Sequence, residues 1–213
     1  SPFSEVSKVI DSALEKLKVQ GVTVVDIDSS LFDKVFAELE SKPPFSSEFK
    51  ADMENYFQSY PGTGFDSVGG FAELGLYHEG LDSFWPFREM VGSYPSELEA
   101  ELKAKWKVLL KQMIEQVMAK HNLDAFIYPS VKVIPAKLGE SQSGYNCNLS
   151  ALAGTPTLAL PAGFTETGVP VGIELLGEAF RDEKLVAMGY AIEEILKARR
   201  PPSTTPALIN GKA

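Results

Sequence analysis

Cysteine and histidine, the side chains that most often form a nucleophile and base pair near neutral pH, are scarce in this sequence. It contains one cysteine, Cys147, and two histidines, His78 and His121. Cys147 acts as a nucleophile only if the fold brings one of these histidines to it as a base. His121 lies at the expected end of a helix, where a positive charge is favoured. Because a lone cysteine is usually a small apolar residue, we do not predict a cysteine-dependent activity.

The residues that could form a metal site or a nucleophile elbow do not have the spacing that such sites require. His78, Glu79 and His121 lack the short intervals between ligands that zinc sites show, so no metal and no cofactor is predicted. Residues 139–144, Gly-Glu-Ser-Gln-Ser-Gly, depart from the G-x-S-x-G pattern and do not join a strand to a helix. Since serine is inert without a base, no catalytic residue is assigned in this chain.

A polar loop between two apolar runs is the strongest candidate for a binding site. Residues 124–128, 157–160 and 171–176 have the length and composition of strands. Turn residues, among them Pro129 and residues 161–163, separate these runs. The loop after Pro129 contains Ser, Gly, Asn and Cys, and open α/β sheets bind ligands just beyond strand ends. We therefore expect a site at this edge of the sheet.

Helical periodicity predicts the elements that surround these strands. The expected helices cover residues 4–20, 30–40, 47–60, 96–121 and 182–198, and residues 22–27 are expected to form a further strand. Ser96 and Glu99 have the spacing of a capping box, and Gly21 suits the end of the first helix. The last helix carries a stripe for the core, formed by Leu185, Gly189, Ile192 and Leu196.

Residues 61–95 form an irregular segment in which glycines alternate with aromatic residues. The glycines and aromatics include Gly62, Gly64, Phe65, Gly69, Gly70, Phe71, Gly75, Tyr77, Gly80, Phe84, Trp85, Phe87, Gly92 and Tyr94. One interpretation is that the aromatic rings pack against the edge of the hydrophobic core and cover it. The other is that they wall an acyl or aryl pocket, or an interface. Irregular segments of this length usually have a function.

The second half of the chain resembles the amidase signature family. The resemblance rests on LDAFIYPS at residues 123–130, ALAGTPTLALPAGFTETGVPVGIELLG at residues 151–177, and RRPP at residues 199–202. It extends from about Val6 to Pro206, is dense after Leu123, and is loose between Pro43 and Pro95. Members of this family are serine hydrolases that cleave carboxamides with a Ser-cisSer-Lys triad. The resemblance implies that this chain is the C-terminal half of such an enzyme.

The catalytic segment of that family has no counterpart in this sequence. No Gly-Gly-Ser-Ser-Gly-Gly run occurs, and Ser67-Val68-Gly69-Gly70 is too short to replace it. In the family the loop after the strand matching 126–129 faces the triad and contacts the substrate. The resemblance therefore implies a pocket wall without covalent chemistry. The predicted substrate-binding residues are Tyr128, Ser130, Tyr145, Asn146, Cys147 and, in the aromatic segment, Trp85.

The asparagines of the polar loop have two interpretations. In the first, Asn146 or Asn148 caps a short helix at residues 150–153 while the other satisfies backbone groups of the loop. In the second, the loop lines the site. Both interpretations stay open at this stage.

Composition and charge limit the classes of partner. Lys and Arg total 20 against 29 Asp and Glu, giving a formal charge of −9, so a nucleic-acid partner is not expected. No apolar run approaches the length of a membrane-spanning helix, and no membrane partner is predicted. One cysteine excludes an internal disulfide and does not identify a compartment.

The sequence thus predicts an α/β fold with a mixed sheet covered by helices, in one domain over residues 1–213. The predicted function is that of the C-terminal portion of an amidase, inactive as an isolated chain. Its expected partners are the N-terminal catalytic half and a small-molecule amide, and self-association is expected where apolar surface is uncovered. Two alternatives are a complementing subunit of a split amidase and a non-catalytic binding domain.

Overall fold

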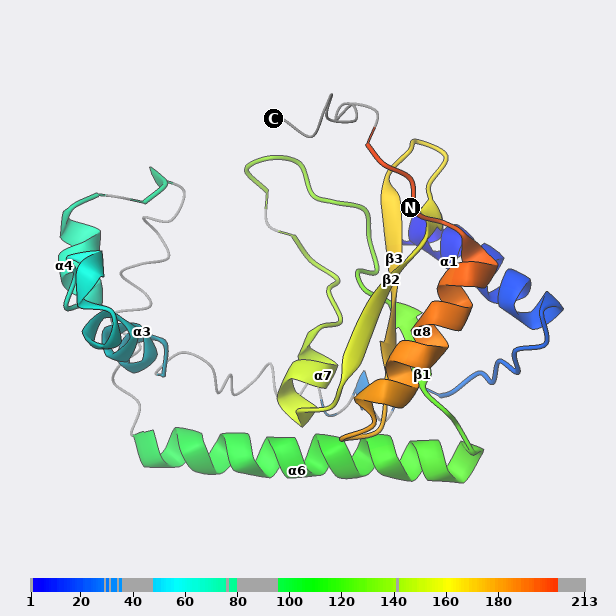
Figure 1. The fold of residues 1–213 in the computed structure, drawn as a ribbon, viewed down its shortest axis with the longest axis horizontal. Helices are drawn as coiled ribbons and strands as arrows, with labels where there is room; N and C mark the ends of the chain where they lie inside the picture. Colours follow the sequence, from blue (N-terminus) through cyan, green and yellow to red (C-terminus); the bar gives the residue numbers. More distant parts are fainter. Residues whose placement is uncertain are drawn as a thin grey trace. The chain divides into compact units, whose positions relative to one another are not determined.

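The computed structural model describes residues 2–28, 30, 32–33, 35, 48–75, 77–79, 96–140 and 142–202. Most of the helices precede a small sheet, whose strands all lie in the second half of the chain (Figure 1). The elements in chain order are α1 (Pro2–Val19), α3 (Glu48–Ser59), the 3₁₀ helix η1 (Pro61–Thr63), α4 (Val68–Glu73), α6 (Ser96–His121), β1 (Phe126–Pro129), α7 (Asn148–Ala153), β2 (Thr157–Phe164), β3 (Pro170–Leu176) and α8 (Asp182–Leu196).

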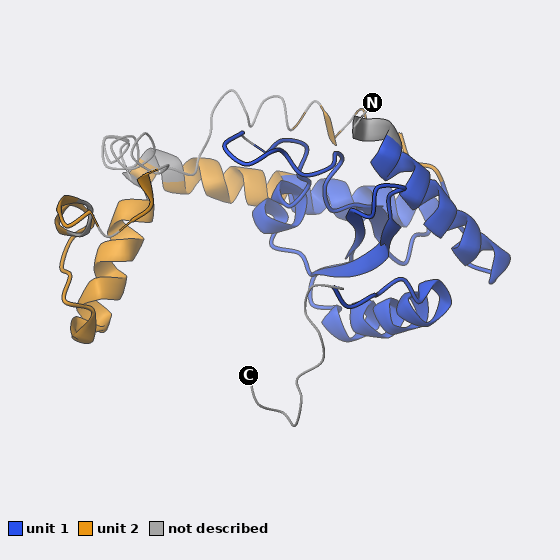
Figure 2. Cartoon of the chain, turned by 90° about the horizontal axis from the view of Figure 1, so that it is seen from above, with its two compact units in different colours: residues 1–25, 110–213 blue, residues 26–109 orange. Residues whose placement is uncertain are grey.

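The chain divides into two compact units. Residues 1–25 and 110–213 form the first unit, which holds the sheet, and residues 26–109 form the second (Figure 2). Helix α6 contributes residues to both units. A single domain over residues 1–213 stays a prediction.

The three strands of the sheet pair antiparallel in the order β1-β3-β2. Tyr128 of β1 and Ala159 of β2 both lie opposite Glu174 of the central strand β3. Residues 161–163, expected to separate strands, instead belong to β2, and a register shift occurs between Pro161 and Gly163. A proline is tolerated here because β2 is an edge strand among the described strands. Proline has no backbone N–H, and β2 has no strand on its outer side to which that group would have to donate.

Helices α1 and α8 cover one face of this sheet. Their buried side chains form one core cluster with the sheet residues that point to the same side. Both helices lie beside the sheet in Figure 1. The cluster comprises Val6, Ile10, Ala13, Leu17, Ala162, Val171, Ile173, Leu175, Leu185, Ile192 and Leu196. The predicted stripe of the last helix is confirmed, since Leu185, Gly189, Ile192 and Leu196 are its buried residues.

The predicted ends of the first helix are close to those observed. The amide of Val22 donates to the carbonyl of Leu17 at 3.1 Å, and Gly21 adopts a φ of 89°. This left-handed conformation is easy for glycine and ends α1. Residues 22–27, expected to form a strand, are not one of the three strands of the sheet.

The second unit contains the helices predicted before the aromatic segment. Helix α3 corresponds to the expected helix over residues 47–60. Of the helix expected over residues 30–40, residues 30, 32, 33 and 35 are described and are helical. In the aromatic segment, η1 and α4 precede residues 77–79, and residues 80–95 lie outside the described part.

Candidate functional site

The loop that follows β1 returns to its own starting point. The amide of Lys132 donates to the carbonyl of Gly144 at 2.7 Å, and the amide of Asn146 donates to the carbonyl of Ser130 at 3.2 Å. Val131 and Tyr145 form an isolated antiparallel bridge between these contacts. The two ends of the loop are therefore held together like the base of a hairpin, which places Asn146 beside the end of β1.

Asn146 fastens this loop to the strand. Its Nδ2 donates a hydrogen bond of 2.7 Å to the carbonyl oxygen of Pro129, the last residue of β1. Helix α7 begins after Cys147, and no side chain caps its N-terminus. The interpretation in which one asparagine satisfies loop backbone thus applies to Asn146, whereas Asn148 does not act as a cap. The reason is that the helix begins two residues earlier than expected, so Asn148 lies within it.

Gln142 closes the far part of the loop. Its Oε1 accepts a hydrogen bond from the amide of Ala136 and its Nε2 donates to the carbonyl of Ser143, both at 2.8 Å. A cleft of about 230 Å³ lies beside this loop, with apolar walls that include Val6 of α1 and Val171 of β3. Ser130 and Gln142 also line the cleft. Its composition suits a small, largely apolar group.

Polar side chains gather on the sheet face that points away from the α1–α8 core cluster. Tyr128 lies directly opposite Glu174, and Thr157 lies opposite Leu176, two residues further along β3. Glu174 is only 9% exposed. Tyr128 OH, Thr157 Oγ1 and Glu174 Oε2 are all buried, and none of them has a partner with hydrogen-bond geometry. The hydroxyl of Tyr128 nevertheless lies close enough to Glu174 and Thr157 for both side chains to affect its pKa through hydrogen bonding.

The phenol of Tyr128 responds to this environment. Burial raises the pKa of Tyr128 well above its usual value, and the negative charge of the neighbouring Glu174 raises it further. A hydrogen bond with Glu174 raises the pKa of Tyr128 as well, and a hydrogen bond with Thr157 lowers it in part. Tyr128 therefore stays protonated and can donate a hydrogen bond over the whole physiological pH range.

The structure brings together most of the residues predicted to bind substrate. Ser130, whose Oγ is buried without a partner, follows Tyr128 by two residues, and Asn146 contacts the residue between them. Tyr145 is 55% exposed. Cys147 is exposed as well and lies directly before the start of α7. Trp85 lies outside the described residues.

Three residues of this region escaped the sequence prediction. Gln142 was missed because its hydrogen bonds join residues of an irregular loop. Glu174 and Thr157 were treated as parts of strands, although a carboxylate within the apolar run VGIELL is itself a signal. A buried charge in a strand generally requires a partner, and that requirement points to this face.

No nucleophile with an adjacent base emerges from the described side chains around the loop. Cys147 Sγ lies 4.0 Å from Oδ1 of Asn148, a neighbour that is not a base. Within the part of the chain that the structure describes, no group of three His, Cys, Asp or Glu residues is arranged to hold a metal ion. None of the helices described is long and apolar enough to cross a membrane.

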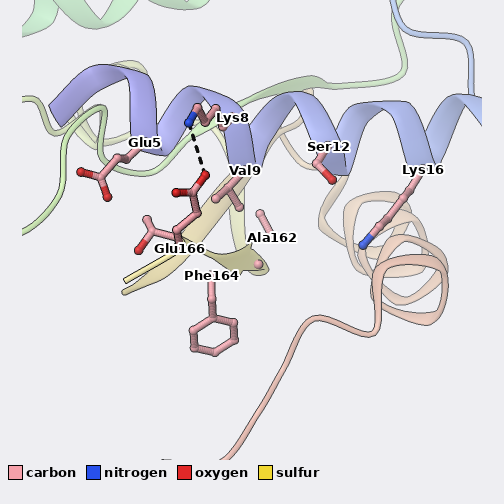
Figure 3. A pocket seen from close by; sticks show the side chains of 10 residues that line it. Glu5, Lys8, Val9, Ser12, Lys16, Ala162, Phe164 and Glu166 are labelled. Atoms are coloured by element: carbon pink, nitrogen blue, oxygen red, sulfur yellow. Dashed lines mark hydrogen bonds and ion pairs between the residues drawn. The ribbon is translucent and has the colours of Figure 1, made fainter. Parts of the chain in front are cut away.

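A second cleft lies between α1 and the β2–β3 hairpin. It measures about 270 Å³ and is lined by charged residues that include Glu5, Lys8, Lys16 and Glu166 (Figure 3). Lys8 Nζ lies 3.3 Å from Glu166 Oε1, and both side chains are largely exposed. An exposed ion pair of this kind contributes little to stability, and the cleft carries mixed charge rather than a site for one sign.

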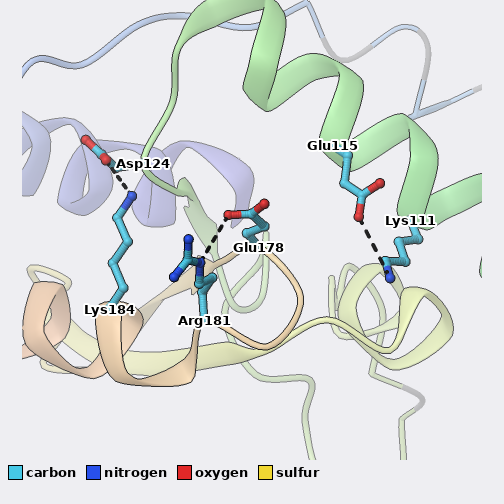
Figure 4. Close-up of polar contacts among 6 residues, drawn as sticks. All are labelled: Lys111, Glu115, Asp124, Glu178, Arg181 and Lys184. Carbon is cyan, nitrogen blue, oxygen red and sulfur yellow. Dashed lines mark hydrogen bonds and ion pairs between the residues drawn. The ribbon is translucent and has the colours of Figure 1, made fainter.

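Exposed ion pairs also surround the turn between β3 and α8. Lys184 Nζ lies 2.7 Å from Asp124 Oδ1, which links α8 to the residues before β1 (Figure 4). Arg181 Nε lies 3.7 Å from Glu178 Oε2 within the turn itself. These contacts orient the start of α8 but are screened by solvent.

Comparison with known proteins identifies the family to which this chain belongs. The profile of the Amidase family matches residues 1–186. Mandelamide hydrolase of Pseudomonas putida is 29% identical over 97% of this chain and 43% of its own length. A glutamyl-tRNA(Gln) amidotransferase subunit from Synechococcus sp. (strain JA-2-3B'a(2-13)) is 28% identical over 98% of this chain and 43% of its own length.

Solved structures give the same result. The native peptide amidase from Stenotrophomonas maltophilia superposes with a TM-score of 0.71 at 26% identity, covering 92% of this chain and 41% of that chain. The chain thus spans less than half the length of the relatives that it matches. The fold class of helices over a sheet is confirmed, and this chain is a partial segment of a member of the amidase family.

Proposed function

We propose that this chain is the C-terminal portion of an amidase-signature hydrolase that cleaves a carboxamide C–N bond. In the intact enzyme an upstream serine attacks the amide carbon, and a lysine acting through a second serine accepts its proton. This chain completes the sheet and supplies one wall of the substrate pocket. The observation that carries the proposal is that the family profile spans residues 1–186, while the relatives are more than twice as long as this chain.

The loop after β1 supplies the pocket wall in this proposal. The arrangement supports it because the loop is closed at its base and tied to the strand through Asn146, so its side chains are held in place. The residues proposed to contact substrate are Tyr128, Ser130, Tyr145, Asn146, Cys147 and Trp85. They bind and orient the amide and do not form a covalent bond with it.

A complementing subunit of a split amidase is the second candidate. Relatives match 97% or more of this chain while only 43% of their own length is covered, as a separately encoded half would also produce. The intact mass of the protein in its source distinguishes a single longer polypeptide from a separate subunit.

Hydrolysis of an aryl amide tests the proposed function. The purified chain is expected to show no turnover, whereas the polypeptide or pair of polypeptides that also contains the Gly-Gly-Ser-Ser-Gly-Gly segment is expected to hydrolyse the amide. Cys147→Ala in the isolated chain is the matched control and should likewise show no turnover. Turnover by the isolated chain that disappears in Cys147→Ala would overturn the proposal in favour of a cysteine enzyme.

A further inference from the structure

Residues 22–27 have the composition of a strand but belong to no strand of the sheet. All but one of them are β-branched, which favours a strand over a helix; these are Val22, Thr23, Val24, Val25 and Ile27. The described residues nevertheless form one sheet of three strands that does not include this segment. A segment with strong strand propensity that lies outside the sheet requires an explanation.

The backbone of this segment is compatible with a strand. Residues 22–28 contain no helix, turn or bend, and none of them has a positive φ. In Figure 1 the segment is the blue trace that leaves the end of α1. Six residues in an extended conformation span about 20 Å, the usual length of a strand. The segment therefore lacks a partner strand rather than a suitable conformation.

Local contacts delimit the segment at both ends. At its start, the amide of Val22 donates to the carbonyl of Leu17 at 3.1 Å and completes the end of α1. At its end, the carboxylate of Asp28 accepts hydrogen bonds from the amide and the hydroxyl of Ser30, at 2.9 and 3.0 Å. An aspartate in this arrangement caps the helical residues that follow it. The residues between these two contacts are the ones left without partners.

Residues 23–27 make no backbone hydrogen bond to any other described residue. Apolar surface is also exposed along the segment, since Val22 is 38% exposed and Val25 is 43% exposed. Water can satisfy exposed backbone groups, but it does not favour exposed valine side chains. Pairing with another strand would supply backbone hydrogen bonds and remove part of this apolar surface from water.

The position of α1 indicates that the partner belongs to a sheet. Helix α1 packs on one face of the sheet through side chains that include Val6, Ile10 and Leu17. Consecutive elements are usually neighbours in space, so a strand that follows such a helix generally joins the sheet that the helix covers. Neither β1 nor β2, the edges of the described sheet, pairs with residues 22–27. The partner is therefore a strand other than the described ones.

The length of the relatives indicates where that strand comes from. This chain spans less than half the length of the amidases that it matches. Backbone donors and acceptors of a strand are satisfied by the backbone of another strand, whatever its side chains are. The remainder of the enzyme can supply such a strand.

We propose that residues 22–27 become a further strand of the sheet by pairing with a strand of the polypeptide that completes the amidase. That polypeptide is the one that carries the Gly-Gly-Ser-Ser-Gly-Gly segment. The proposal rests on the proposed function, because that function supplies the second polypeptide. Residues 23–27 form the hydrogen-bonded ladder, and Val22 and Val25 lose exposed apolar surface. The segment is then a contact surface between the two parts of the enzyme.

Hydrogen exchange of backbone amides provides the first test. In the isolated chain the amides of residues 23–27 should exchange nearly as fast as in an unfolded peptide, because they are not hydrogen-bonded. In the assembled enzyme they should exchange at least about a hundredfold more slowly. The amide of Leu175, in the central strand β3, is the control and should be protected in both states. Unchanged exchange of residues 23–27 on assembly overturns the inference.

The same measurement distinguishes two other partners. Protection in the isolated chain that rises with protein concentration would identify a second copy of this chain as the partner. Protection that does not depend on concentration would identify a partner strand within this chain. Either result overturns the inference.

Proline substitution provides the second test. Successive N–H groups of a strand point to opposite sides, so Val24→Pro and Val25→Pro remove donors on opposite sides. With a partner on one side, one of these variants should weaken assembly about tenfold or more, and the other should have a smaller effect. Val24→Thr keeps the N–H and a β-branched side chain, and as the matched control it should assemble like the parent chain.

Thermal unfolding of the isolated chain shows whether the proline variants act on assembly alone. Neither Val24→Pro nor Val25→Pro should lower the unfolding midpoint, because neither amide is hydrogen-bonded there. A midpoint that falls in either variant would show that the segment already has a partner within this chain, which overturns the inference.

The outcomes separate this inference from the proposed function. If the parent chain assembles and supports amide hydrolysis while both proline variants assemble equally well, the inference is wrong and the proposed function stands. If the parent chain neither assembles with that polypeptide nor supports amide hydrolysis with it, the proposed function is wrong and the inference falls with it.

Discussion

At the scale of single residues, the sheet face around Tyr128 combines burial with negative charge. A phenol loses its proton with difficulty when the resulting anion would be poorly solvated and would lie beside a carboxylate. Tyr128 meets both conditions, since its hydroxyl is buried and the residue lies opposite Glu174. Ionisation of Tyr128 therefore costs more free energy in the folded chain than in the unfolded chain.

The pH dependence of unfolding should reveal this difference. The pKa of Tyr128 is raised in the folded state, so the unfolded chain binds fewer protons above about pH 10, and stability falls as pH rises through that range. Between about pH 9 and about pH 11, the parent chain should lose about 1 kcal/mol more unfolding free energy than Tyr128→Phe. Urea denaturation at both pH values measures the difference, and equal losses in the two proteins would contradict it.

At the scale of elements, the packing of α8 on the sheet depends on a glycine. Gly189 lies on the buried stripe of α8, and a Cβ at this position would collide with Cδ2 of Leu158 in β2. The absence of a side chain therefore sets how closely α8 approaches β2. Helix propensity alone would favour alanine here, so the close approach outweighs the local preference.

Gly189→Ala should destabilise the chain by about 1 kcal/mol, because the strain of overpacking exceeds the gain in helix propensity. The paired variant Gly189→Ala with Leu158→Ala should lose less stability than the sum of the two single variants, since truncation of Leu158 removes the collision. Chemical denaturation of Gly189→Ala, Leu158→Ala and the double variant measures the interaction free energy between the two positions. Additive losses would show that the two residues do not constrain each other.

At the scale of the whole molecule, the chain exposes surfaces that small proteins usually cover. Phe180, at the turn before α8, is 92% exposed, and Tyr190 on α8 is also exposed. Both β1 and β2 are edge strands among the described strands, and edge strands present unpaired backbone groups. These features suit a chain that forms part of a larger amidase.

The isolated chain is accordingly expected to self-associate. Sedimentation velocity should show species larger than the monomer, and a dye that fluoresces in apolar surroundings should bind. Addition of the polypeptide that completes the amidase should reduce both signals, because it covers the same surface. A monodisperse monomer without dye binding would instead support an independent binding domain.

The sequence by itself determined most of the local elements of the first unit and their family, although residues 22–27 do not form the expected strand. Gly21 predicts the end of α1, the spacing of Leu185 and Ile192 predicts the buried stripe of α8, and the three apolar runs predict the strands, because these signals arise from neighbouring residues. The position of the polar loop after β1 was predictable for the same reason.

Only the tertiary structure decided which residues meet. The order β1-β3-β2 places Tyr128 opposite Glu174, and a shift of the register by one residue would turn either side chain to the other face. The hydrogen bond from Asn146 to Pro129 likewise joins residues separated by a loop. Such contacts depend on how distant segments pair, and local periodicity carries no information about that pairing.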